Sequence, residues 1–155
     1  GKVVFEGAFG SADAMGKRAL EPGSKFRIGS VTKQFTAAAI LLLQEEGKLA
    51  LSDPLEKYYP DWPNGDKITV EQLLTHTSGI KSYTSKADFL QGVESFIEPE
   101  KLVVSFRNDP PDFEPGSEFR YNNSAYFLLG EIVRRVSGRS FREFLQVRLF
   151  DPLGM

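Results

Sequence analysis

Apolar positions along the chain group into short stretches separated by polar segments and by segments rich in glycine and proline. The longest uninterrupted apolar run, residues 37–43, follows the tetrapeptide Ser-Val-Thr-Lys at 30–33 and predicts a long helix that begins near Ser30. Because apolar residues occupy nearly every side of this helix, we expect it to be an interior helix. The run is too short to span a bilayer.

Capping signals predict further helices. Thr69 and Gln72 form a capping box that opens a short helix, and Gly79 is expected to end it. Pro99 suits the first position of a helix through Phe106. We also expect a helix over Tyr126–Ser137 that is capped by Asn123 or Ser124, and one opened by the capping box of Ser140 and Glu143 that ends near Asp151 and Pro152.

The Ser30-x-x-Lys33 pattern carries the first candidate chemistry. Residues three apart lie on one face of a helix, so the hydroxyl of Ser30 and the amine of Lys33 are expected to meet. The N–H groups of the first helical turn and the helix dipole can then stabilise an oxyanion formed at the serine. A lysine takes up a serine proton only when burial or a nearby cation lowers the lysine pKa. A simpler alternative is a helix cap at Ser30 and a solvated charge at Lys33.

A second copy of the pattern, Ser78-x-x-Lys81, stands in a different setting. It follows the short helix predicted after Thr69 and enters a polar loop over residues 81–86, where nothing in the sequence indicates a fixed geometry. The first copy is therefore the candidate nucleophile site.

Tyr121 and Asn123 form the second candidate element. They follow a proline-spaced loop, residues 109–116, and make the only Tyr-x-Asn pattern in the chain. A phenol beside an ammonium group can move a proton, and an amide can hold both a lysine and a substrate carbonyl. The simpler interpretation is that Asn123 caps the next helix and Tyr121 packs beneath it.

Composition excludes several other chemistries. The chain has no cysteine, so disulfides, thiol nucleophiles and cysteine-ligated zinc are ruled out, and a net charge of −2 argues against a nucleic-acid partner. The single histidine, His76, allows no metal-spaced histidine pair, and no Gly-x-Ser-x-Gly elbow presents a serine to it. We expect His76 to be structural, with its ring bonded to the last carbonyls of the short helix.

Seven ordered segments resemble the serine β-lactamase and penicillin-binding-protein superfamily, particularly its class C β-lactamase and esterase-like branch. The resemblance implies an α/β (α+β) fold in which a helical subdomain joins part of an antiparallel sheet, truncated at both ends. Residues 1–155 would form a partial catalytic domain, with a strand portion over 1–29 and a mainly helical subdomain over 30–155. The matching segments are Gly1–Phe5 with Ala8–Gly10, Phe26–Lys33, Gly47–Leu49 with Leu51–Pro54, Ile68–Val70 with Leu73–Gly79, Phe113–Gly116, Tyr121–Asn123 and Pro152–Met155.

The resemblance also implies roles for the candidate residues. Ser30 would be the acylated nucleophile, Lys33 its proton acceptor or relay, Tyr121 the partner base and Asn123 the substrate-orienting amide. No cofactor and no metal are implied. The third motif of the superfamily, Lys-Thr-Gly or His-x-Gly on a strand that donates an oxyanion N–H, does not occur in this sequence. Losing one such donor typically costs about 10²- to 10³-fold in rate.

Three functions follow as alternatives. The first is a serine hydrolase that acts on β-lactams, small esters or D-alanyl peptides, with esterase- or peptidase-like activity preferred. The second is a penicillin-binding sensor module that is acylated without turnover. The third is a non-catalytic fragment whose partner is the missing remainder of its own domain, with self-association also considered. The sequence shows no signal peptide or anchor and leaves the compartment open.

Overall fold

The computed structural model describes residues 2–87, 89 and 96–155, and it divides into two compact units, Gly1–Val31 and Thr32–Met155. The helices and single helical turns are η1 (Gly29–Val31), α1 (Thr32–Glu45), η2 (Leu55–Lys57), η3 (Gly65–Lys67), α2 (Val70–Leu74), η4 (Tyr83–Ser85), α4 (Pro99–Arg107), α5 (Asn123–Ser137), α6 (Phe141–Leu145), η5 (Gln146–Phe150) and α7 (Asp151–Leu153).

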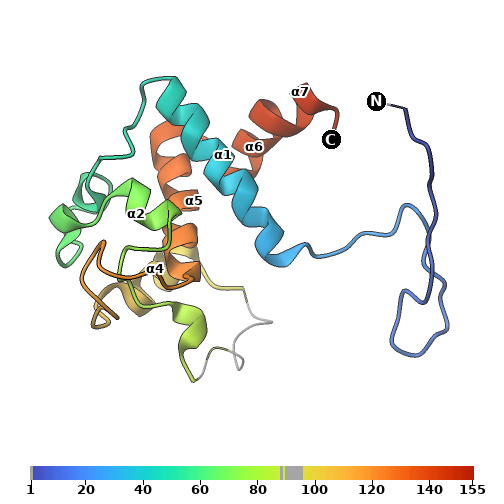
Figure 1. The fold of residues 1–155 in the computed structure, drawn as a ribbon, viewed down its shortest axis with the longest axis horizontal. Helices are drawn as coiled ribbons and strands as arrows, with labels where there is room; N and C mark the ends of the chain where they lie inside the picture. Colours follow the sequence, from blue (N-terminus) through green and yellow to red (C-terminus); the bar gives the residue numbers. More distant parts are fainter. Residues whose placement is uncertain (1, 88, 90–95) are drawn as a thin grey trace. The chain divides into compact units, whose positions relative to one another are not determined.

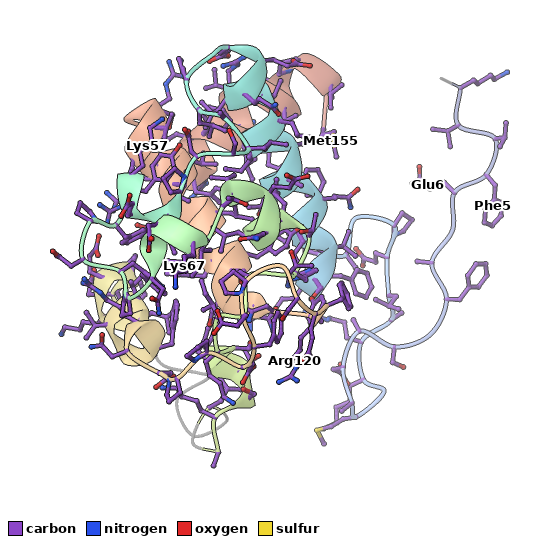
Figure 2. All side chains as sticks on the ribbon, turned by 60° about the vertical axis from the view of Figure 1, so that its left-hand side comes forward. Phe5, Glu6, Lys57, Lys67, Arg120 and Met155 are labelled. Atoms are coloured by element: carbon purple, nitrogen blue, oxygen red, sulfur yellow. The ribbon has the colours of Figure 1, made fainter. Side chains whose placement is uncertain are left out.

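The first unit does not form the expected strand. Its one hairpin-like turn is closed by an isolated antiparallel bridge between Ser11 and Ala19, and no strand is assigned among residues 2–31. Phe5 is one of several exposed apolar residues here (Figure 2). A single hairpin is marginal without further strands or a helix packed on it. The sheet that the family resemblance implied is therefore not formed by the described residues, which are mostly helical.

The second unit is built around α5 (Figure 1). Helices α1, α2, α4 and α6 all pack on α5. The side chains of α5 that contact them follow the helical period and are fully buried: Ala125, Leu128, Leu129, Ile132 and Val133. Gly138, in the left-handed conformation, ends this helix by donating its N–H to Arg134 O.

Helix α1 buries one face and not its whole circumference. The buried positions, Thr36, Ala39, Ile40 and Leu43, recur at helical spacing. Leu41, on another side of the helix, is 45% exposed. The prediction of an interior helix was therefore wrong for this structure, because the elements of the second unit cover only the side of α1 that faces α5 and α6.

The capping signals located three of the later helices well. Both predicted capping boxes form, at Thr69 with Gln72 and at Ser140 with Glu143, and α4 begins at Pro99 as expected. The second box opens a helix that passes through the π-helical turn η5 into α7.

Gly79, by contrast, does not end the short helix, because α2 already ends at Leu74. A Cβ atom at Gly79 would lie 2.0 Å from Phe113 O, and its φ is +73°. Glycine stands here because the 109–116 loop passes against its backbone.

Candidate active site

Backbone hydrogen bonds attach the loop before α5 to the segment after α2. The N–H groups of Asp112, Gly116 and Arg120 donate to the carbonyls of Gly79, Thr77 and His76, at 2.8, 2.8 and 2.9 Å. Asp112 also accepts from Lys81 at 2.7 Å and lies 3.3 Å from Arg120, whose position on this loop is labelled in Figure 2. These contacts fix the chain that leads into Tyr121.

Asn122 is the N-cap of α5, one residue before the predicted cap, and the helix begins at Asn123. Its Oδ1 accepts from Ala125 N at 2.8 Å and its Nδ2 donates to Ile80 O. Asn122 is buried and its backbone is extended. Its two bonds and its burial fix the backbone between Tyr121, which is exposed, and Asn123, which opens α5.

Lys33 is the residue that these two side chains meet. Its Nζ donates to Asn123 Oδ1 at 2.6 Å, although 90 residues separate the two in sequence. The same Nζ lies 4.6 Å from the centre of the Tyr121 ring and 5.4 Å from that of Tyr126. An ammonium over an aromatic face is attracted by the ring quadrupole. Three of the four predicted site residues thus come together in one cluster.

The ring of His76 packs against the aromatic side chains of this cluster. Its ring centre lies 4.8 Å from the ring of Tyr121, 4.9 Å from Tyr126 and 5.9 Å from Phe119. Its Nδ1 accepts the backbone N–H of Asn122 at 3.1 Å, which places the ring proton of the neutral side chain on Nε2. Burial, followed by the charge of Lys33, lowers the pKa of His76. The expected bond to the carbonyls of the short helix is replaced by this bond to Asn122.

Tyr126, in the first turn of α5, is a further aromatic residue beside Lys33 and His76. Its hydroxyl donates to Leu74 O at 3.0 Å, which joins the end of α2 to α5. Burial, with a smaller contribution from the nearby Tyr121, raises the pKa of the Tyr126 phenol. Tyr121 itself is 47% exposed and is thus open to solvent or substrate.

Ser30 belongs to the first unit, where it lies exposed in η1. Helix α1 begins two residues later, at Thr32, so Ser30 stands in a single 3₁₀ turn directly before the α-helix. Its meeting with Lys33 stays a prediction from the Ser-x-x-Lys spacing.

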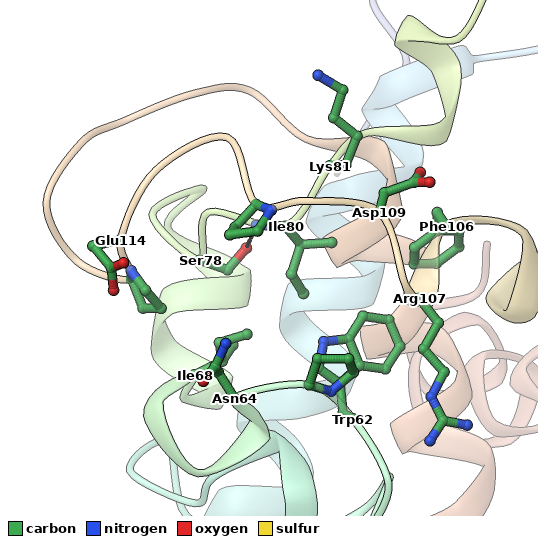
Figure 3. A pocket seen from close by; sticks show the side chains of 13 residues that line it. Trp62, Asn64, Ile68, Ser78, Ile80, Lys81, Phe106, Arg107, Asp109 and Glu114 are labelled. Carbon is green, nitrogen blue, oxygen red and sulfur yellow. Dashed lines mark hydrogen bonds between the residues drawn. The ribbon is translucent and has the colours of Figure 1, made fainter.

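The second Ser-x-x-Lys copy has a supporting position. Ser78 is 2% exposed, and Lys81 forms its ion pair with Asp112. Both residues line a pocket of the second unit, together with Trp62, Ile80 and Phe106 (Figure 3). Figure 3 shows the Lys81 side chain directed away from Ser78, so this copy does not pair a hydroxyl with an amine.

The polar stretch after Lys81 is held in place, contrary to expectation. Ser82 and Thr84 both bond to Asn123, and Tyr83 N donates to the buried Ser124 Oγ at 2.9 Å. Sequence reasoning missed these contacts and those of Asn122 and His76. His76 and Asn122 lie in segments already matched to the superfamily, whereas Ser82, Tyr83 and Thr84 lie outside all of them.

No group of three or more candidate ligands that could hold a metal ion occurs in the part of the chain that the structure describes. Within the same part, no helix has the length and apolar character needed to cross a membrane.

Comparisons with known proteins identify the family of this chain. The model of the β-lactamase family matches residues 1–155. The putative penicillin-binding protein PbpX of Bacillus subtilis is 36% identical over 155 residues, which are all of this chain and 38% of that protein. The chain thus spans well under half of this curated relative.

Two solved structures are similar in fold. A D-stereospecific amidohydrolase from Streptomyces sp. has a TM-score of 0.77 and 38% identity, over 83% of this chain and 42% of that one. The D-amino acid amidase of Ochrobactrum anthropi, complexed with D-phenylalanine, has a TM-score of 0.84 and 30% identity, over 95% and 41%. With a family model that covers its whole length and a lysine cluster built from two separate motifs, the chain belongs to the β-lactamase family.

Proposed function

We propose that this chain carries the acylation centre of a serine hydrolase. Ser30 Oγ attacks a substrate carbonyl carbon and forms the acyl-serine, while its proton passes to Lys33, which acts as the base. Tyr121 relays that proton to the leaving group, and Asn123 orients the substrate carbonyl. Water then hydrolyses the acyl-serine and restores the hydroxyl. All four residues correspond to motif positions of the superfamily.

One observation carries the proposal: Lys33 Nζ lies 2.6 Å from Asn123 Oδ1 and over the ring of Tyr121. A solvated first-turn lysine would have no need of an amide and an aromatic ring brought from 90 residues away. The simpler interpretation, in which Asn123 serves as a cap, loses its basis because Asn122 supplies the cap. Asn123 is thus left to bond Lys33.

The relatives favour an amide substrate of D configuration within the three classes considered. Two of the similar structures are named for D-stereospecific amide hydrolysis or D-amino acid amides. We therefore place D-alanyl peptides and D-amino acid amides ahead of small esters and β-lactams. The name of the Bacillus relative supports a second candidate, a penicillin-binding protein that is acylated without turnover. The rate of deacylation distinguishes these two functions.

Intact-mass spectrometry tests the acylation centre directly. The protein in its full natural length is incubated with a fluorophosphonate and, separately, with benzylpenicillin. We expect one adduct that disappears in Ser30→Ala and persists in Ser78→Ala, the matched variant in the second Ser-x-x-Lys copy. Equal loss in both variants, or no adduct on a folded protein, would refute the assignment of Ser30.

Turnover is then measured with D-phenylalanine amide and L-phenylalanine amide as a matched pair. Release of ammonia from the D-amide alone would support the amidase function. A stable penicillin adduct together with no amide hydrolysis would favour the penicillin-binding alternative.

A further inference from the structure

We propose that the hydroxyls of Ser82 and Thr84 position the amide of Asn123, with Thr84 as the residue that holds the orientation of the amide toward Lys33. This inference rests on the proposed function, in which Asn123 orients the substrate. It assigns a role to the polar turn η4 and the residue before it, which contain neither Ser-x-x-Lys copy nor the Tyr-x-Asn pattern.

The three residues form a closed ring of hydrogen bonds. Asn123 N donates to Ser82 Oγ at 3.3 Å, and Asn123 Nδ2 donates to Thr84 Oγ1 at 2.9 Å. The two hydroxyl oxygens are 3.0 Å apart and bond to each other. The backbone and the side chain of Asn123 are therefore both held by one two-hydroxyl unit.

This ring matters because Asn123 can present either end of its amide. The oxygen and nitrogen ends have nearly the same shape, and only the oxygen accepts a hydrogen bond from the lysine ammonium, which is a donor alone. With Thr84 accepting from Nδ2, Oδ1 is left facing Lys33 at 2.6 Å. A reversed amide would point its NH₂ group at another donor. The second hydrogen on Nδ2 is not used by the bond to Thr84.

The turn that carries the two hydroxyls is itself fixed. Ser85 donates to Ser82 O through its backbone N–H at 3.0 Å and through its hydroxyl at 2.7 Å. Tyr83 N donates to Ser124 Oγ, in the first turn of α5. The position of Thr84 relative to Asn123 is thus set by bonds that do not involve Thr84, so its hydroxyl can be removed without releasing the turn.

The test compares Thr84→Val, which keeps the shape and removes the hydroxyl, with Thr84→Ser, which keeps the hydroxyl. Ser82→Ala removes the other member of the pair and serves as the independent second variant. Thr75→Val is a matched control, because Thr75 Oγ1 also lies 3.0 Å from a hydroxyl two residues away, at Thr77, on an exposed turn. The rate at which fluorophosphonate modifies Ser30, with loss of fluoride and formation of a phosphonyl-serine, is measured for each folded variant.

A second readout does not depend on activity. The hydrogen-exchange rates of the Asn123 side-chain NH₂ and backbone N–H are measured by ¹⁵N NMR. These rates report the two bonds separately, and a merely structural loss elsewhere in the fold would not move them selectively.

We expect Thr84→Val to lower the rate of modification by about tenfold, the equivalent of one partly buried hydrogen bond left unmade, and to accelerate exchange of the Asn123 NH₂. Thr84→Ser and Thr75→Val should stay within about twofold of the parent rate. Ser82→Ala should accelerate exchange of the backbone N–H of Asn123. Parent-like behaviour of Thr84→Val, or equal losses in Thr84→Ser and Thr84→Val, would overturn the proposal.

A failure of the proposed function can be distinguished from a failure of the positioning role. If the parent protein forms no adduct, the acylation assignment fails, and the exchange rates alone decide the positioning role. Faster exchange confined to the Asn123 NH₂ in Thr84→Val supports that role, and unchanged exchange refutes it.

Discussion

His76 is the only histidine of the chain, and two substitutions separate what its ring and its acceptor nitrogen contribute. His76→Asn places a carbonyl oxygen near the position of Nδ1, where it can still accept the backbone N–H of Asn122. The φ of residue 76 is 61°, and asparagine tolerates this left-handed conformation well. His76→Ala removes both the acceptor and the ring.

The contacts set the size of the two effects. His76→Ala leaves a buried N–H without a partner, at about 1–3 kcal/mol, and removes aromatic packing worth about 0.5–1.5 kcal/mol. We expect it to lower the free energy of unfolding by about 2–4 kcal/mol. His76→Asn keeps the hydrogen bond and should lose only the packing, about 1 kcal/mol.

The pH dependence gives the sharper test. Burial and then the charge of Lys33 lower the pKa of His76 in the folded protein. The unfolded chain, whose histidine has the ordinary pKa of about 6.5, therefore binds more protons than the folded protein as the pH falls below that value. The stability contributed by neutral His76 is complete above about pH 6.5 and is lost as the pH falls toward its folded pKa. Protonation of Nδ1 would also remove the bond from Asn122 and place a cation near Lys33.

Urea unfolding from pH 7.5 to 4.5, followed by circular dichroism, measures this loss. As the pH falls below about 6.5, the parent protein should lose stability more steeply than His76→Asn, in which residue 76 cannot bind a proton. Carboxylates affect both proteins alike and cancel in the difference. Identical slopes, or equal destabilisation by His76→Asn and His76→Ala at pH 7.5, would refute the reasoning.

Two further substitutions test how the loop before α5 is held. Gly79→Ala would put a Cβ atom 2.0 Å from Phe113 O, so we expect it to lower the free energy of unfolding, measured with urea, by more than about 3 kcal/mol. Gly138→Ala, also at positive φ but with open space around it, should lower it by about 1 kcal/mol. Similar losses in both would mean that the loop moves away easily. Asn122→Ala removes the cap of α5 and the bond to Ile80 O and should cost about 2–4 kcal/mol by the same measurement; an effect below about 1 kcal/mol would show that Asn122 does not anchor the segment.

Local signals predicted several helix ends well. The capping boxes at Thr69 and Ser140 and the proline at 99 act through contacts within four residues, so their effect can be read from spacing alone. The cap of α5 was misplaced because the tripeptide holds two adjacent asparagines, and either can cap a helix. Burial of Asn122 against Ile80, which spacing does not show, decides between them.

Contacts between residues far apart in the sequence were harder to predict. The meeting of Lys33 with Tyr121 and Asn123 was predicted through the family resemblance, because no local rule joins residues 90 positions apart. The bond of His76 to Asn122 had no signal beyond the place of both residues in matched segments, and the contacts of Ser82 and Thr84 had none. These bonds join residues 46 positions apart for His76, 41 for Ser82 and 39 for Thr84, and the last two lie in a segment that by composition resembles an ordinary polar loop.

The two Ser-x-x-Lys copies show how far a short pattern determines chemistry. A nucleophile must be reached by a substrate, and at 2% exposure the hydroxyl of Ser78 cannot be, whereas Ser30 is exposed in η1. Lys81 is engaged by a carboxylate, that of Asp112, and Lys33 is engaged by the uncharged amide of Asn123. The second lysine is thus tied in an ion pair that holds a loop, whereas the first lies beside an amide and an aromatic ring of the candidate site. The second copy instead ties the 109–116 loop to the segment that leads to Ser82 and Thr84, and so supports the residues that hold Asn123.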